Sequence, residues 1–270
     1  MKGTFTPSAA AKSLSKGYHF NAASTPITVR FSSSTGIPVI PDTDPNANPR
    51  GIAIRFHLPD VDGKRQHTDI IAHSTPFFPV NSAELFLQLL VALGSGKAPE
   101  FLAANPSAAA FVGAPKPFPE SFGSAAYWSV NAFKLTNSES KSKFIRYRIV
   151  PAGGEKYLSD EDVKGKPASY LFEGIAGQLP FTFKLVAQVA QDGDQTNDAT
   201  VRWPEDRELV ELGEFKLESL VGEAEQASQQ QRIIFDPIPR GVDGVEPSDD
   251  PLLVQRADLY LVSGKIRREA

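Results

Sequence analysis

Alternation of apolar and polar residues with a period of two is the feature that most limits how this chain can fold. Six segments show it, each rich in β-branched or aromatic residues and bounded by Pro, Gly or Asn. They are Ile27–Phe31, Ile52–Leu58, Ala132–Leu135, Phe144–Val150, Phe181–Val189 and Glu211–Leu217. Because helical patterns do not alternate regularly with these segments, the sequence predicts antiparallel strands in a β-barrel or a β-sandwich.

A helical pattern follows the second of these strands. Asn81 or Ser82 can cap a helix that runs to Leu93, because both side chains accept hydrogen bonds from free backbone N–H groups. The side chains expected to face a core are Leu85, Leu89 and Val91.

Further helices are expected in the second half of the chain. Ser159 can start one, with acidic residues in its first turn. Another is predicted over residues 249–262, with Asp249 or Asp250 as the cap and Pro251 at the first helical position. Strand patterns continue on both sides of the helices, so we expect residues 1–270 to form a single domain.

Composition narrows the possible partners and locations. The chain has 270 residues, a formal net charge of −4 and no apolar run that approaches the length of a membrane span, about 20 residues. We therefore expect no nucleic-acid or membrane partner and a cytosolic location. The sequence has no P-loop, Gly-x-Gly-x-x-Gly, His-Glu-x-x-His or Gly-x-Ser-x-Gly pattern.

The chain contains no cysteine, and its single methionine is Met1. Thiolate metal sites, disulfides and cysteine nucleophiles are thereby excluded. Cysteine and methionine are the side chains most readily oxidised, so their near absence suits a protein that handles peroxide. Drift in a lineage that uses little sulfur accounts for the composition equally well.

The C-terminal run RADLYLVSGKIRR contains a tyrosine between two arginines at helical spacing. Tyr260 lies one turn after Arg256, and Arg267 lies two turns further on the same face. A guanidinium at this distance lowers the pKa of a phenol, and a phenolate is a hard ligand for ferric haem iron. Arg267 suits a carboxylate partner. A solvated surface helix has the same spacing, so this run alone does not decide between the two.

Several short motifs together resemble the catalase family. They follow the family's order and span residues 3 to 267, nearly the whole chain. The matching segments are Thr25–Ser32 (TPITVRFS), Asn48–Gly51, Asp69–Phe78 (DIIAHSTPFF), Phe133–Leu135, Val201–Pro204, Phe235–Pro237, Gly244–Asp250 and Arg256–Tyr260. The short length and the Ala-His-Ser variant at 72–74 are most similar to the small catalase-related haem peroxidases.

This resemblance implies a fold and a cofactor. The fold is α+β, an eight-stranded antiparallel barrel with helical additions, and the cofactor is haem b. Tyr260 is the implied axial ligand of the iron, and Arg256 supports its phenolate. Arg30 and Arg267 are the implied partners of the haem propionates. The residues expected to line the distal face are Phe78, Phe77 and Phe86, of which Phe86 has the weakest correspondence.

The resemblance also predicts a difference from the family. The family's distal histidine precedes a Gly-x-Phe segment that corresponds to Gly3-Thr4-Phe5, so we expect the chain to be shortened at its N-terminus and to lack this histidine. His73 occupies the position of the family's distal asparagine. It is a candidate distal acid and base, and the alternative is a histidine that bonds to a propionate or a backbone carbonyl. We expect His19, His57 and His67 to be surface residues.

The function implied by the resemblance is that of a haem-dependent peroxidase that consumes hydrogen peroxide or small organic hydroperoxides, and an organic molecule is the candidate electron donor. Without the distal histidine, catalase turnover is expected to be weak, because general acid–base help contributes ~10²–10⁴-fold. Two alternatives stay open. The chain could bind haem without turning over peroxide, or it could rearrange a lipid or natural-product hydroperoxide. The resemblance also implies a homo-oligomer, a dimer or a tetramer.

Overall fold

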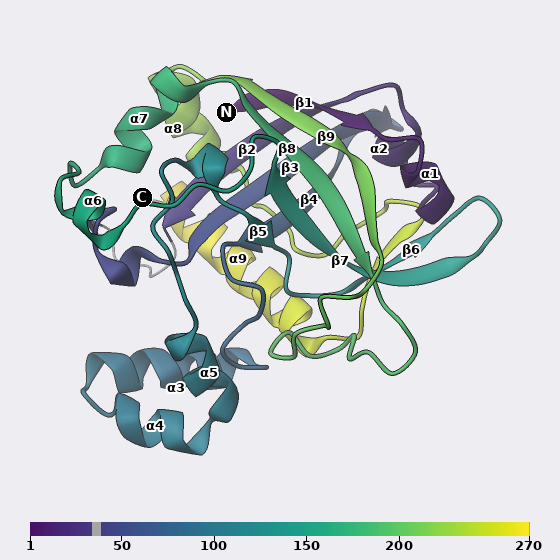
Figure 1. The fold of residues 1–270 in the computed structure, drawn as a ribbon. Coiled ribbons are helices and arrows are strands. Elements are labelled where there is room, and N and C mark those ends of the chain that lie inside the picture. Colours follow the sequence, from purple (N-terminus) through teal and green to yellow (C-terminus); the bar gives the residue numbers. More distant parts are fainter. Residues whose placement is uncertain (34–38, 270) are drawn as a thin grey trace.

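The computed structural model describes residues 1–33 and 39–269, and its centre is a closed antiparallel β-barrel (Figure 1). The order of strands around the barrel is β1 (Lys2–Pro7), β2 (Thr25–Ser33), β3 (Arg50–Val61), β4 (Lys64–His73), β5 (Tyr127–Trp128), β7 (Ser142–Pro151), β8 (Phe181–Val189) and β9 (Leu209–Ser219). Pairing of β9 with β1 and of β7 with β8 closes the ring. The predicted eight-stranded barrel is confirmed, and the sandwich alternative is wrong.

Two further strands extend the sheet outside the ring. β6 (Phe133–Thr136) pairs with the start of β7, and β10 (Val245–Pro247) pairs with β6. All six predicted strands are present, but β1, β4, β5 and β10 were not among them. The first half of β4 is polar, Lys64 to Thr68, and β5 and β10 are very short, so none of these carries a clear alternating pattern.

Aromatic side chains fill much of the barrel interior. Phe5 and Phe56 meet edge to face with ring centroids 5.3 Å apart, and Phe183 stacks on Phe215 at 5.1 Å. All four rings are fully buried. Burial of such rings supplies a large share of the hydrophobic free energy that stabilises a core, so the interior of the barrel is a packed core.

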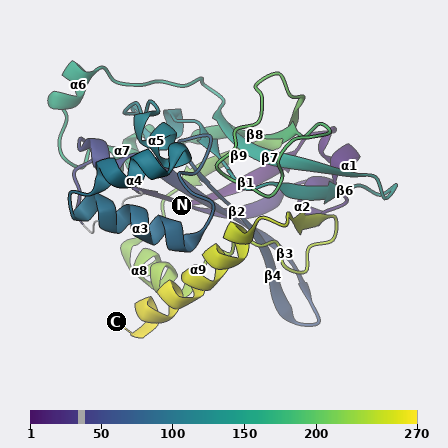
Figure 2. The same cartoon turned by 90° about the horizontal axis from the view of Figure 1, so that it is seen from below.

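Helices lie at the ends and sides of the barrel. They are α1 (Ala11–Leu14), α2 (Tyr18–Asn21), α3 (Ala83–Gly94), α4 (Ala98–Ala104), α5 (Pro106–Gly113), α6 (Asp160–Lys164), α7 (Tyr170–Gln178), α8 (Glu223–Arg232) and α9 (Pro251–Glu269). Figure 2 shows α3 and α9 on the same side of the molecule, where the Ala83 N–H donates to the Gln255 side chain at 2.7 Å. Within residues 1–33 and 39–269, no helix combines the length and apolar character that a bilayer crossing requires.

The predicted helix starts are confirmed. Ser82 accepts a hydrogen bond from the Leu85 N–H at 3.2 Å, and Ser159 accepts one from Asp162 at 3.1 Å. Asp250 accepts one from the Leu252 N–H at 2.9 Å at the start of α9.

Two details of the helix predictions are wrong. Val91 is exposed, and Ala92 faces the core beside Leu89, because the buried face of α3 is narrower than expected. α9 runs to Glu269 rather than 262, although it contains Gly264. A Cβ at Gly264 would lie 2.3 Å from Ile234 Cδ1, so this glycine lets the helix pack closely against the preceding segment.

The prediction that His19 is a surface residue is also wrong, whereas His57 and His67 are exposed as expected. His19 is 1% exposed, and its ring lies 4.0 Å from Phe20 and 4.8 Å from Phe56 between centroids. Burial in this aromatic pocket lowers its pKa from 6.5 to about 3. Folding therefore selects the neutral imidazole.

Because His19 is buried in its neutral form, the free energy of unfolding should fall when the solution is made acidic. Between pH 6.5 and about 3 the unfolded chain binds a proton at His19 that the folded chain does not, so stability falls as pH falls through this window. The loss from this one group between pH 8 and 5 is about 2 kcal/mol. We expect His19→Phe to remove that part of the pH dependence in urea unfolding followed by circular dichroism.

His67→Gln, on the exposed hairpin, is the control and should retain most of the acid loss. An unchanged pH dependence in His19→Phe would show that protonation elsewhere dominates.

Candidate functional site

Tyr260 and Arg256 form a hydrogen-bonded pair on α9. Arg256 Nη2 donates to Tyr260 Oη at 3.2 Å, one helical turn along the same face. Burial alone would raise the pKa of Tyr260, but the charge and hydrogen bond of Arg256, together with the charge of Arg30, lower the pKa below its ordinary value of 10.0. The pair therefore makes loss of the phenol proton easier, and the phenolate is the form that binds a ferric ion.

A buried chain of hydrogen bonds orients Arg256. Its Nη1 donates to Asn131 Oδ1, and Asn131 Nδ2 donates to Asp250 Oδ2 at 2.7 Å. Asp250 also caps α9, so one carboxylate serves both the helix start and the arginine. Sequence reasoning missed Asn131, because it lies 125 positions from Arg256 and nothing in its local pattern connects the two.

His73 ends β4 and lies near enough to Arg256 to feel its charge. Its Nδ1 lies 2.6 Å from Thr75 Oγ1, and its Nε2 is buried without a hydrogen-bond partner among the described residues. Burial lowers the pKa of His73 to about 3, and the charge of Arg256 adds to this effect. A buried polar atom without a partner costs free energy, so Nε2 is suited to a ligand that completes the site. Thr75 was missed by sequence reasoning, although its position two residues from His73 could have indicated it.

The three phenylalanines predicted for the distal face divide into two groups. Phe78 contacts His73, with ring centroids 6.0 Å apart, and Phe86 of α3 packs on Phe78 at 5.1 Å. Phe77 points elsewhere and meets Phe111 edge to face at 5.8 Å. Both phenylalanines lie in the irregular segment that follows β4, and the path of the chain there sends them in different directions. Phe78 and Phe86 thus form one apolar wall beside His73.

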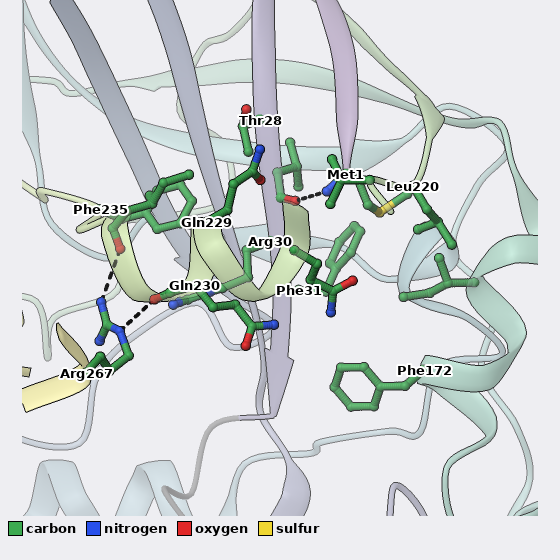
Figure 3. A pocket seen from close by; sticks show the side chains of 15 residues that line it. Met1, Thr28, Arg30, Phe31, Phe172, Leu220, Gln229, Gln230, Phe235 and Arg267 are labelled. Carbon is green, nitrogen blue, oxygen red and sulfur yellow. Dashed lines mark hydrogen bonds between the residues drawn. The ribbon is translucent and has the colours of Figure 1, made fainter. Parts of the chain in front are cut away.

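Arg30 and Arg267 line one cavity of about 320 Å³ between β2, α8 and α9 (Figure 3). The Arg30 guanidinium lies 5.2 Å from the centroid of the Phe235 ring and has no carboxylate partner within the described part of the chain. Burial lowers the pKa of Arg30; a charge on Tyr260 would raise it, and Arg267 lowers it further. A partly desolvated guanidinium without a carboxylate suits an anionic ligand.

Backbone and side-chain oxygens hold Arg267 in place. It donates to the Gln230 carbonyl at 2.9 Å and to the Ile233 carbonyl at 3.1 Å (Figure 3). It also donates to Ser263 Oγ at 2.7 Å. Two of these acceptors belong to α8 and the residue that follows it. The prediction from sequence placed Arg267 on the same face as Tyr260, and the link to α8 was not foreseen.

The donor set is suited to haem rather than to a bare metal ion. Residues 1–33 and 39–269 contain no cluster of three or more His, Cys, Asp or Glu side chains that could hold a metal. A porphyrin supplies four nitrogen ligands itself and needs only an axial donor, for which the Tyr260 phenolate is suited. Arg30 and Arg267 are suited to its carboxylates, and the unpartnered Nε2 of His73 to a molecule bound at the iron.

Titration of Tyr260 tests the electrostatics of this site. In the haem-free protein, Arg256→Met should raise the pKa of Tyr260, because burial remains while the compensating charge and hydrogen bond are lost. The ultraviolet absorbance of tyrosinate against pH measures this, and subtraction of a Tyr260→Phe titration isolates the residue.

Arg240→Met, which removes an exposed arginine paired with Asp236 at 2.6 Å, is the matched control. An equal shift in both arginine variants would contradict a specific effect of Arg256.

Comparison with known proteins agrees with the fold and the order of the motifs. The sequence profile of the catalase family matches residues 1–268. A catalase-related peroxidase of Mycolicibacterium paratuberculosis is 31% identical over 281 residues, covering 98% of this chain and 85% of the relative. One of Synechococcus elongatus is 30% identical over 276 residues, covering 97% and 78%.

Solved catalase structures have the same fold. A fungal catalase superposes with a TM-score of 0.83 at 22% identity, covering 98% of this chain and 57% of the catalase chain. Catalase A from Saccharomyces cerevisiae gives a TM-score of 0.83 at 21% identity, with 98% and 59% covered. The chain thus spans somewhat more than half the length of these larger enzymes. From the profile match over nearly its entire length and from both relatives, the chain belongs to the catalase family.

Proposed function

We propose that this chain is a haem b-dependent catalase-related peroxidase that consumes hydrogen peroxide or a small organic hydroperoxide, with an organic molecule as the candidate electron donor. The observation that carries the proposal is the Arg256–Tyr260 pair, in which Arg256 lowers the pKa of Tyr260. Membership of the catalase family and the similarity to two catalase-related peroxidases support it.

Each residue has a distinct part in this proposal. When bound, haem supplies the iron at which the peroxide oxygen–oxygen bond is cleaved. Tyr260 binds the iron as phenolate, and Arg256 keeps its proton off. Arg30 and Arg267 bind the haem carboxylates. Phe78 and Phe86 exclude water from the face next to His73, which strengthens electrostatic interactions there.

His73 is the proposed distal acid and base. Peroxide cleavage needs a proton moved from the inner to the outer oxygen, and a neutral imidazole can accept and return that proton. With a pKa of about 3, His73 is neutral at pH 7 and accepts readily only if the bound peroxide loses its proton easily. The Thr75 hydroxyl, 2.6 Å from Nδ1, can donate to this nitrogen or accept from it, so it orients the ring in either tautomer.

The low pKa of His73 also favours the second candidate, a haem-binding protein with little peroxide turnover. A base that binds a proton so weakly is far from the pKa that suits proton transfer at neutral pH. Rearrangement of a larger hydroperoxide needs less proton movement and is the third candidate. We further propose a homo-oligomer, and the cytosolic location stays a prediction.

Haem reconstitution tests the ligand assignment. Added haem should give a Soret band and a ferric-phenolate spectrum in the wild-type chain, and Tyr260→Phe should lose the phenolate bands because the anionic ligand is gone. Tyr18→Phe removes an exposed tyrosine and is the control. A folded wild-type chain without a Soret band would refute haem binding, and survival of the spectrum in Tyr260→Phe would refute Tyr260 as ligand.

His73→Leu tests the proton transfer. We expect kcat/KM for donor oxidation to fall by ~10²-fold or more while the Soret band persists, since general acid–base help has this size. His67→Leu, on the exposed hairpin, should leave turnover unchanged. Equal turnover in His73→Leu and wild type would assign His73 a binding role.

The products separate the three candidates. Oxygen release indicates catalase turnover, oxidised donor indicates peroxidase turnover, and an isomerised hydroperoxide without oxygen indicates rearrangement.

A further inference from the structure

α9 has a second face that no described residue covers. Val254, Leu259, Leu261, Val262 and Ile266 are between 54% and 61% exposed. With 3.6 residues per turn, these positions fall on one side of the helix, opposite the side that buries Leu253 and Ala257. An exposed apolar strip of this kind on a helix marks an interaction surface, and here the strip is crossed by Asp258 and Lys265.

The charged residues on this strip would be complementary to those of a second, antiparallel copy of the helix. Asp258 and Lys265 lie seven residues apart, two turns along the same face, with Leu261 and Val262 midway between them. Asp258 forms no ion pair within the described residues, and Lys265 lies 3.9 Å from Glu269 in an exposed pair that contributes little.

We propose that α9 pairs with α9 of a second copy of this chain, antiparallel about a two-fold axis that passes between Leu261 and Val262. In this arrangement Leu261 packs on the partner's Val262. Asp258 lies opposite the partner's Lys265, and Lys265 lies opposite the partner's Asp258. An isologous interface requires this kind of self-complementary patch. A parallel arrangement would place like charges opposite each other, which the pattern disfavours.

The neighbouring charges are compatible with this register. Arg268 donates to the Arg232 carbonyl at 3.1 Å and is thereby turned toward α8 rather than the strip. Arg256 and Arg267 are held on the opposite side of the helix by Tyr260 and by the end of α8. Asp258 and Lys265 are therefore the charged residues nearest the proposed two-fold axis, and Glu269 lies at the end of α9.

Charge reversal tests the pairing in sedimentation velocity over a range of concentrations. Wild type should dimerise, and Asp258→Lys and Lys265→Asp should each weaken dimerisation by about tenfold, because each change acts twice across the axis. The double variant D258K/K265D should restore it. Asp60→Lys, on the exposed β3–β4 hairpin, is the matched control.

A cysteine pair tests the register, since the chain has no cysteine of its own. D258C/K265C should form a covalent dimer on mild oxidation, whereas each single variant should not, because the two copies of one position then lie too far apart for a disulfide. Within one chain these positions are about 10 Å apart along the helix axis and cannot bridge.

Three outcomes would overturn the proposal: a monomer at every concentration, a dimer insensitive to both single reversals, or single reversals that the double variant does not rescue. The second outcome points to another surface, and the third to another occupant of the strip. Circular dichroism confirms that each variant folds. Measurement with and without haem separates a failure of pairing from a failure of the proposed haem site.

Discussion

The hydrogen bond between Arg256 and Tyr260 is the interaction on which the rest of the site depends. Without the guanidinium, burial would raise the pKa of the phenol, and a protonated phenol is a poor ligand for ferric iron. The bond needs α9 to be helical, and α9 begins at Asp250, whose second oxygen accepts from Asn131. Helix formation and ligand ionisation are therefore linked through one buried carboxylate.

The barrel positions the groups that face this pair. β4 ends at His73, and Arg30 projects from β2, so neighbouring parts of one sheet present an imidazole and a guanidinium toward the same helix. Strands closed into a barrel cannot shift independently of one another. α9 packs on the rest of the molecule through the buried Leu253 and Ala257, and near its end through Gly264 against Ile234 and the links of Arg267 to α8. The site thus combines a rigid wall with a helix that has its own attachments.

Much of this arrangement could be predicted from the sequence because it depends on local patterns. Period-two alternation identified β2, β3, β6, β7, β8 and β9. The caps Ser82, Ser159 and Asp250 were recognised from their side-chain chemistry. What could not be predicted depends on contacts between distant segments. The local sequence around His19 does not indicate its burial between aromatic rings, and the sequence around Arg256 does not indicate its bond to Asn131. The different directions of Phe77 and Phe78 depend on the path of an irregular segment, so a shared motif did not separate them.

β2 separates the packed interior of the barrel from the cavity that Arg30 and Arg267 line. Val29 and Phe31 point into the packed interior, and Arg30 between them points into the cavity with Arg267. A slip of one residue in the pairing of β2 with β3 would bring the guanidinium into an aromatic core and turn Phe31 out. Misaligned barrels would therefore lose core stability and the anion-binding group together, so selection for either property also preserves the other.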